Sequence, residues 1–222
     1  MKTIILGPPG TGKTTTLLNL VDEFIQQGVR PKQIGYFSFT KKAATEAASR
    51  AAIKFELDTD NDLENFRTLH SYAFKMLGMT KEKMMSASDY KEFGEKCGIP
   101  IKTAKFSTED GTFNSDNEYL TIINTARVRQ MDLLEYYDSR QNILDIERGT
   151  LYLISEELKR YKSEKRLKDF TDLLQDFIDK KIKSKFEVLF IDEAQDLSLL
   201  QWKMVKQIWQ NVDKTYIAGD DD

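Results

Sequence analysis

The chain has one cysteine, Cys97, and one histidine, His70, among its 222 residues. A single thiol excludes an intramolecular disulfide, and these two residues cannot supply the ligands of a zinc or iron–sulfur site. Any bound metal must therefore have oxygen ligands. The sequence also lacks an apolar run of the roughly 20 residues that a membrane helix needs. Its start lacks the apolar length and cleavage site of a signal peptide, so we expect a cytoplasmic protein without membrane contact.

A strong excess of either charge is missing as well. The 33 basic and 36 acidic residues give a net charge of -3, so the overall field does not indicate nucleic-acid binding, and a DNA site would have to be a local groove. A composition of 40% hydrophobic and 31% charged residues is typical of a soluble, globular and helix-rich chain. The length predicts one main domain that carries a smaller insertion.

A phosphate-binding pattern follows the first apolar run. The pattern G-x-x-x-x-G-K-[ST] is met by Gly7, Gly12, Lys13 and Thr14, just before a helix that apolar spacing predicts over residues 13–27. Glycines allow successive N–H groups to turn inward, and the helix N-terminus adds a positive dipole end. We expect a phosphate cradle in which Lys13 meets the β- and γ-phosphates and Thr14 binds Mg²⁺. The alternative is a Gly/Pro-rich turn without a ligand.

A pair of carboxylates ends the most strand-like run of the chain. Residues 186–191 read as a buried strand, and Asp192 and Glu193 follow at its carboxyl end, where ligands collect in open α/β sheets. We expect Asp192 to hold Mg²⁺ and Glu193 to orient or deprotonate an attacking water. A solvated acidic loop is the alternative. The predicted contacts of the nucleotide, which we take to be ATP, are Gly10, Thr11, Gly12, Lys13, Thr14 and Thr15.

Strands and helices alternate at both ends of the chain but not in its middle. The spacing of apolar and capping residues predicts strands at 2–6, 34–39, 65–68, 186–191 and 215–218, and helices at 13–27, after Thr40, at 70–77, at 169–184 and after Ser198. Residues 79–166 contain helical patterns at 119–137 and 144–161 and a polar passage at 107–117. The sequence therefore predicts an α/β fold with a central parallel sheet flanked by helices, plus an inserted helical subdomain.

These motifs resemble those of superfamily 1 DNA helicases of the UvrD/Rep/PcrA type. Residues 38–44, SFTKKAA, are similar to that family's motif Ia, TFTNKAA, and residues 68–71, TLHS, are similar to its motif Ib, TFHS. Residues 169–174, DFTDLL, resemble the D-F-x-D-L-L segment before the acidic strand. Residues 218–222, AGDDD, resemble the start of motif III, GDDDQ. Residues 79–166 carry none of these motifs.

The resemblance implies a RecA-like P-loop NTPase fold and the activity of an ATP-dependent DNA helicase or single-stranded DNA translocase. Residues 1–78 and 167–222 would form the ATP-binding domain 1A, and residues 79–166 would form its insertion, domain 1B. The catalytic residues it implies are Lys13, Glu193 and Gln195, the last coupling the γ-phosphate to the DNA. The implied partners are single-stranded DNA and proteins of DNA repair or replication.

The resemblance also implies a track for the single strand, where hydroxyl and ammonium groups meet phosphates and bases pack on aromatic faces. The residues that it places on this track are Phe39, Thr40, Lys42 and His70. Without the resemblance, Thr40 is explained as a helix N-cap, Phe39 as a core residue and His70 as a residue at a helix start. The residues alone leave these alternatives open.

Several features depart from the family pattern. Lys41 stands where Asn is usual and Leu69 where Phe is usual, which bears on the DNA contacts. No glutamine-bearing segment precedes the phosphate loop, so adenine selectivity is not implied. In the family a second RecA-like domain follows Asp222 and supplies arginine fingers, which are worth about 10³ to 10⁵ in rate. We therefore expect a fragment that hydrolyses ATP slowly by itself.

Two other functions use the same phosphate loop. A small-molecule or nucleotide kinase would transfer phosphate to an acceptor under an arginine-rich lid, whereas Glu193 after Asp192 favours water as the acceptor. A nucleotide-dependent interaction module would close on a partner without motor activity. The basic run at residues 159–168 could meet nucleic-acid phosphates, although such runs are usually solvated helix ends.

Overall fold

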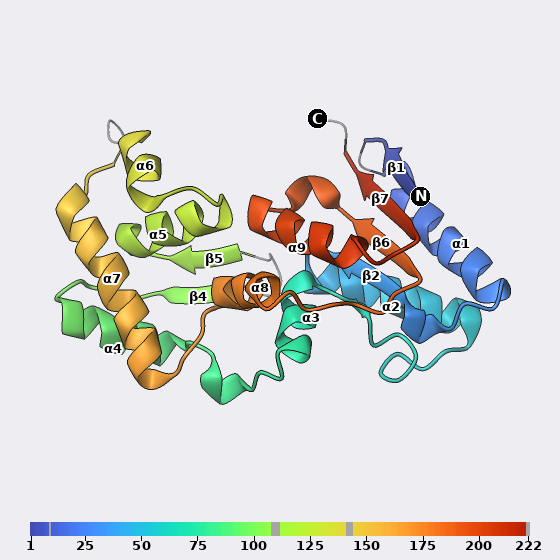
Figure 1. Cartoon of the computed structure of the whole chain (residues 1–222), viewed down its shortest axis with the longest axis horizontal. Helices are drawn as coiled ribbons and strands as arrows, with labels where there is room; N and C mark the ends of the chain where they lie inside the picture. The colour runs from blue at the N-terminus through green and yellow to red at the C-terminus, as the bar shows by residue number, and fades with distance from the viewer. Residues whose placement is uncertain (9, 108–111, 141–143, 221–222) are drawn as a thin grey trace.

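The computed structural model describes residues 1–8, 10–107, 112–140 and 144–220 (Figure 1). The strands are β1 (Lys2–Leu6), β2 (Ile34–Ser38), β3 (Phe66–Arg67), β4 (Ala104–Ser107), β5 (Thr112–Ser115), β6 (Val188–Asp192) and β7 (Lys214–Gly219). The helices are α1 (Lys13–Gln26), α2 (Lys41–Phe55), α3 (Leu69–Met76), α4 (Ala87–Cys97), α5 (Glu118–Val128), α6 (Leu133–Asp138), α7 (Arg148–Lys165), α8 (Phe170–Asp179) and α9 (Leu199–Trp209). Short 3-10 turns are η1 (Pro31–Gln33), η2 (Lys81–Lys83) and η3 (Ala194–Asp196).

A parallel sheet forms the centre of one part of the molecule, with the strand order β1-β7-β6-β2-β3. Its register pairs Leu6 with Gly219 and Ser38 with Asp192, so the carboxyl ends of four neighbouring strands meet at one edge. The phosphate loop follows β1 at this edge, and the acidic pair ends β6. The predicted α/β fold with a central parallel sheet flanked by helices is confirmed.

Helices cover both faces of this sheet. Along β6, Val188 and Phe190 pack in a cluster with apolar residues of α1 and α2, whereas Leu189 and Ile191 pack in another with residues of α3, α8 and α9. All five residues of β6 are buried, which is the pattern of a strand covered on two sides. A stripe of small side chains on α2 is buried as well, and it lets this helix lie close to the sheet. The stripe consists of Ala44, Ala47, Ala48 and Ala51.

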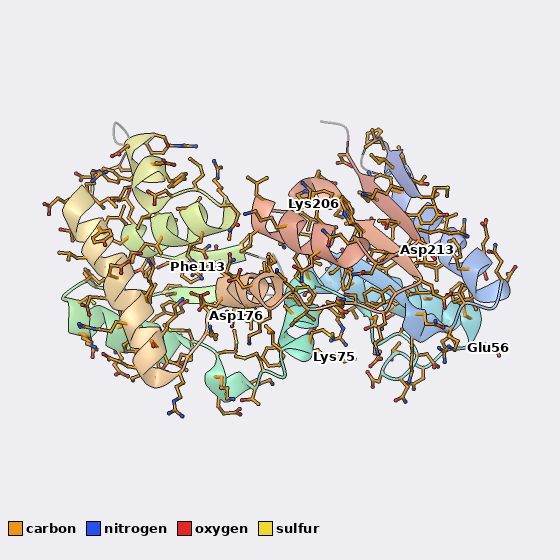
Figure 2. All side chains as sticks on the ribbon, in the orientation of Figure 1. Glu56, Lys75, Phe113, Asp176, Lys206 and Asp213 are labelled. Atoms are coloured by element: carbon orange, nitrogen blue, oxygen red, sulfur yellow. The ribbon has the colours of Figure 1, made fainter. Side chains whose placement is uncertain are left out.

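A third apolar cluster lies in the part of the molecule drawn on the left of Figure 1. It is built from α4, α5 and α7 and includes Phe93, Leu151 and Tyr161, each exposed by 2% or less. Figure 2 shows Phe113 of β5, which is only partly buried against this cluster. The strands β4 and β5 pair antiparallel with Phe106 opposite Phe113, an arrangement that the polar passage at 107–117 did not predict.

Some helix ends differ from those predicted. The pattern at 119–137 does not form one helix, because the backbone of Gln130 has a φ of 55° and the Asp132 side chain caps a new helix, α6. The helix predicted at 169–184 ends at Asp179, and Lys181 has a φ of 50°. Gln130 and Lys181 each follow the end of a helix. The apolar spacing continues past both ends, so it did not indicate that the helices stop there. Over the described residues, none of the helices is both long and apolar enough to cross a membrane.

A buried ion network joins α8 to α5 and α7. Arg127 of α5 contacts Asp169 at 2.7 Å and Asp172 at 2.5 Å, and Lys162 of α7 contacts the same carboxylates at 2.6 and 2.7 Å. Asp169 and Asp172 also form the capping box that starts α8. These positive neighbours hold the pKa of the Asp169 carboxyl well below its usual range despite its burial. Figure 2 shows Asp176 further along α8, at the junction between the two parts of the molecule.

Candidate functional site

The phosphate loop has the backbone conformation that its glycines permit. Gly10 and Gly12 have φ angles of 81° and 84°, and Gly12 is the N-cap of α1. The Thr11 hydroxyl donates to the Pro8 carbonyl at 2.8 Å, which braces the turn from inside. A Cβ at Gly7 would lie 2.9 Å from that hydroxyl oxygen, so glycine is needed there for space. Pro9 lies outside the described residues.

The Lys13 ammonium lies across the mouth of this loop. It donates to the carbonyl oxygens of Gly7 at 2.6 Å and Pro8 at 3.1 Å, and it pairs with the Asp220 carboxylate at the end of β7. The side chain is 7% exposed. Its hydrogen-bonded ion pair with Asp220 raises the pKa of Lys13. A phosphate group that bound at the loop would therefore have to compete with Asp220 for this cation.

The Asp192 carboxylate lies beside the first turn of α1. Its Oδ2 atom accepts hydrogen bonds from the hydroxyls of Thr14 at 2.9 Å and Tyr36 at 2.8 Å, and its Oδ1 accepts from the Glu193 N–H at 3.1 Å. Burial raises the pKa of Asp192, and the negative charge of Glu193 adds to this, while the two hydroxyls oppose it. Burial and the Asp192 charge raise the pKa of Tyr36 well above its usual range. Carboxylate and hydroxyl oxygens at this spacing are ligands of the kind that Mg²⁺ prefers.

Glu193 and Gln195 form a second chain of hydrogen bonds towards Asp220. The Gln195 side-chain amide donates to Glu193 Oε2 at 2.7 Å, and its oxygen accepts from the Asp220 N–H at 3.1 Å. The Glu193 backbone has a φ of 53°, a left-handed conformation that costs a non-glycine residue on the order of 1 kcal/mol. This turn points the carboxylate of Glu193 into the same cavity as Lys13.

The cavity at this edge of the sheet has a volume of about 300 Å³. Its lining residues are Gly10, Gly12, Lys13, Thr14, Thr15, Arg50, Glu193 and Asp220. Of the predicted nucleotide contacts, Thr11 instead braces the loop. The sequence analysis did not predict Arg50 of α2, because a single arginine on the exposed face of a helix has no distinguishing pattern. Asp220 appeared there only within the resemblance to motif III, whose Asp221 and Asp222 lie outside the described residues.

A longer groove of about 800 Å³ lies between α2, β3, α3 and the start of α8. We call it the aromatic groove after its lining phenylalanines, which are Phe39, Phe66, Phe74, Phe106 and Phe170. Its polar lining includes the cations Lys41, Arg67 and Lys81, the hydroxyls of Thr68 and Ser71, and the carboxylates of Asp60 and Glu64. Phe106 stacks on Phe170 with ring centroids 4.2 Å apart and an angle of 14°. Strand β4 thus contributes a ring to this groove.

The four residues predicted for the DNA track are not all alike in their surroundings. Phe39 and His70 line the aromatic groove. Thr40 caps α2 by accepting a hydrogen bond from the Ala43 N–H at 3.1 Å, and Lys42 is exposed in the first turn of that helix. Lys41, which replaces the usual asparagine of motif Ia, lines the groove.

His70 is a buried, neutral side chain. It is 8% exposed, and its ring lies 4.6 Å from that of Phe106 and 6.1 Å from that of Phe170. Burial lowers the pKa of His70 to about 4. At neutral pH this residue can stack or form a hydrogen bond, but it cannot offer a positive charge to a phosphate.

The basic run at 159–168 has carboxylate partners within the molecule. Lys159 contacts Glu156 at 2.7 Å, Arg160 contacts Glu157, and Lys165 contacts Glu92 at 2.5 Å. Lys162 belongs to the buried network at α8. These pairings support the interpretation of this run as a solvated helix end.

Comparisons with known proteins give matches that cover all or nearly all of the chain. The family model described as the UvrD/REP helicase N-terminal domain matches residues 1–222. The "ATP-dependent DNA helicase Rep" of Buchnera aphidicola subsp. Baizongia pistaciae is 26% identical over 240 residues, which cover 99% of this chain and 33% of the relative. A "Probable DNA helicase II homolog" of Mycoplasma pneumoniae is 24% identical, with 98% of this chain and 32% of the relative covered. The chain thus spans about a third of the length of these relatives.

Proposed function

The chain belongs to the UvrD/REP helicase N-terminal domain family, and we propose that it forms the ATP-binding part of a motor that moves along single-stranded DNA. One observation carries the proposal: Lys13, Thr14 and Glu193 line one cavity at the carboxyl edge of a parallel sheet, and Asp192 is hydrogen-bonded to Thr14 beside it. This is where nucleotides bind in open α/β folds. The same family membership does not favour the kinase alternative.

The nucleotide in this proposal is Mg-ATP. The N–H groups at the start of α1 and the Lys13 ammonium bind the β- and γ-phosphates, and Arg50 borders the same cavity. Mg²⁺, held by Thr14 and, through water, by Asp192, would neutralise charge on the phosphates. Thr14 can donate its proton to Asp192 and still offer a lone pair to the ion.

The reaction is hydrolysis of the γ-phosphate. Glu193 orients a water and takes its proton, while the water oxygen bonds to the γ-phosphorus and the bond to the bridging oxygen of ADP breaks. In this proposal Gln195 couples cleavage of the γ-phosphate to the rest of the domain, because its side chain is hydrogen-bonded both to Glu193 and to the Asp220 backbone. Turnover at motor rates would need a further group that stabilises the transition state, such as an arginine finger.

The aromatic groove is the proposed site of the single strand. Its rings can stack on bases, and Lys41, Arg67 and Lys81 can meet phosphates. In this proposal residues 1–78 and 167–222 are domain 1A and residues 79–166 are the insertion 1B, which adds Phe106 to the groove. A local groove of this kind is compatible with a net charge of -3.

Nucleotide binding is tested by calorimetric titration of the chain with the non-hydrolysable analogue AMP-PNP in Mg²⁺. Lys13→Ala should weaken binding at least tenfold, because the variant loses the cation that faces the phosphates. Lys206→Ala, on the exposed surface of α9, is the matched control and should bind like the wild type. Equal binding by the wild type and Lys13→Ala would refute the nucleotide site.

DNA binding is tested by fluorescence anisotropy with a labelled oligo-dT strand. Phe39→Leu keeps an apolar side chain against the core but removes an aromatic face, so the affinity should fall about tenfold. Tyr152→Leu is the control, because this tyrosine is exposed on α7 away from the groove. If the two variants bound the strand equally well, the groove would not be its site.

A further inference from the structure

A buried tyrosine lies between the nucleotide cavity and the aromatic groove. Tyr36 is in the middle of β2 and is 0% exposed. Its hydroxyl donates to Asp192 Oδ2 at 2.8 Å, the same oxygen that accepts from Thr14 at 2.9 Å. Sequence motifs gave no reason to single it out, because an aromatic residue within a buried strand is ordinarily a core residue.

The Tyr36 hydroxyl determines which lone pairs of the Asp192 carboxylate remain free for other partners. A carboxylate has about four lone-pair sites, two on each oxygen. Thr14 and Tyr36 fill those of Oδ2, and the Glu193 N–H takes one on Oδ1. The remaining site is therefore on Oδ1, and the group cannot rotate without breaking these hydrogen bonds. A water bound to Mg²⁺ would find one fixed acceptor.

The ring of the same tyrosine reaches the wall of the groove. Tyr36 stacks on Phe66 with centroids 5.0 Å apart and an interplanar angle of 5°, because the two residues are paired across β2 and β3. Phe66 is 6% exposed and lines the aromatic groove. A single aromatic ring thus separates the wall of the groove from the carboxylate.

We propose that Tyr36 is a positioning residue of the nucleotide site: its hydroxyl orients Asp192 towards the metal, and its stack on Phe66 links that orientation to occupancy of the groove. This inference rests on the proposed function, since it assumes that Mg-ATP binds at the phosphate loop and a single strand in the groove. It assigns to one buried side chain a hydrogen bond to Asp192 of the nucleotide site and a stack on Phe66, which lines the groove.

The hydroxyl is tested with Tyr36→Phe, which removes one oxygen and keeps the ring. AMP-PNP binding to the chain is measured by calorimetry in EDTA and across a Mg²⁺ titration. The affinity in EDTA should match that of the wild type, whereas the Mg²⁺ concentration needed for half of the affinity gain should rise about tenfold, as for partners of metal ligands. Tyr72→Phe is the matched control, because its buried hydroxyl also bonds a side chain, Ser184 at 2.9 Å, on the other face of the sheet.

The stack is tested with Phe66→Leu, which keeps apolar bulk and the Tyr36 hydroxyl. The Mg²⁺ titration is repeated with saturating oligo-dT. The strand should shift the Mg²⁺ midpoint of the wild type, and the shift should be lost in Phe66→Leu, since coupling between two sites must pass through what connects them. Each shift is measured against the midpoint of the same protein without the strand, so that any effect of Phe66→Leu on the basal midpoint is separated from the coupling.

The outcomes separate the inference from the proposed function. If the wild type fails to bind AMP-PNP, the proposed function itself is wrong. If the wild type binds with a Mg²⁺ dependence that Tyr36→Phe shares, or that Tyr72→Phe changes as much, the positioning role is overturned. If the strand shifts Phe66→Leu as it does the wild type, or shifts neither, the link to the groove is overturned.

Discussion

At the scale of the residue, Asp220 competes with a bound phosphate for the Lys13 ammonium group. The carboxylate pairs with Lys13 inside the cavity that would receive a triphosphate. Asp220→Asn should therefore bind AMP-PNP in EDTA about fivefold more tightly, a gain of about 1 kcal/mol, because one negative charge near the phosphates is removed. The comparison is Asp213→Asn, at the other end of β7 (Figure 2), which should leave the affinity unchanged. A weaker complex for Asp220→Asn would mean that this carboxylate supports binding.

His70 should make the stability of the protein depend on pH between 5 and 7. Its folded pKa of about 4 lies below the ordinary value of 6.5, so the unfolded chain binds a proton in a range where the folded protein does not. Stability must then fall as the pH falls, by about 2 kcal/mol from pH 7 to pH 5 for this one group. Urea unfolding at both pH values would measure it. His70→Gln should lose about that much of the pH dependence, and an unchanged slope would show that His70 is not buried as a neutral ring.

The sequence pattern singled out the candidate site residues whose grouping depends on the local chain, and it missed those that tertiary contacts bring to the same place. The phosphate loop and the acidic pair were identified because their spacing and their place at a strand end are local properties. Tyr36 reaches Asp192 through the pairing of β2 with β6, and Arg50 reaches the cavity through the placement of α2. Neither contact leaves a trace in the neighbouring sequence.

At the scale of the element, the buried ion network should fix the start of α8. Arg127→Met would leave Lys162 as the remaining cation beside the buried Asp169 and the partly buried Asp172, so it should destabilise the fold by about 3 kcal/mol. The measurement is urea unfolding at pH 7. Arg148→Met is the matched control, since its pair with Asp138 is about half exposed and should be worth less than about 1 kcal/mol. A similar loss in both variants would make burial irrelevant to the network.

Elements with their own start signals were predicted well, and those without them were not. Thr40 and Ser198 are observed N-caps, and the helices that they start begin where predicted. The break between α5 and α6 was missed, because Gln130 adopts a positive φ without being Gly or Asn. The pair β4–β5 was missed because each strand has four residues and their apolar side chains are only Ala104, Phe106 and Phe113.

At the scale of the whole molecule, the alternation of strands and helices predicted the parallel sheet, since parallel strands need a crossover connection that is usually a helix. The alternation did not predict which contacts attach residues 79–166 to the elements around the sheet. The third apolar cluster is separate from the two that cover the sheet, while the ion network and the Phe106–Phe170 stack cross between them. The two parts could thus unfold together or as separate units.

Hydrogen exchange with and without ligand should distinguish these behaviours. A ligand that binds only the folded state, at one hundred times its Kd, stabilises it by about 2.7 kcal/mol, which slows exchange through unfolding about a hundredfold. If residues 79–166 form a unit of their own, Mg-AMP-PNP should slow exchange in the slowest amides of β2, β6 and β7 and leave those of α4 and α7 unchanged.

Mass spectrometry of peptides from these segments gives the readout, and Lys13→Ala at the same ligand concentration is the control, whose slowing should be smaller by about tenfold or more because its Kd is at least tenfold higher. Slowing by the same factor in α7 as in β6 would contradict the division at residues 79 and 166. Residues 79–166 would then belong to the same cooperative unit as the parallel sheet.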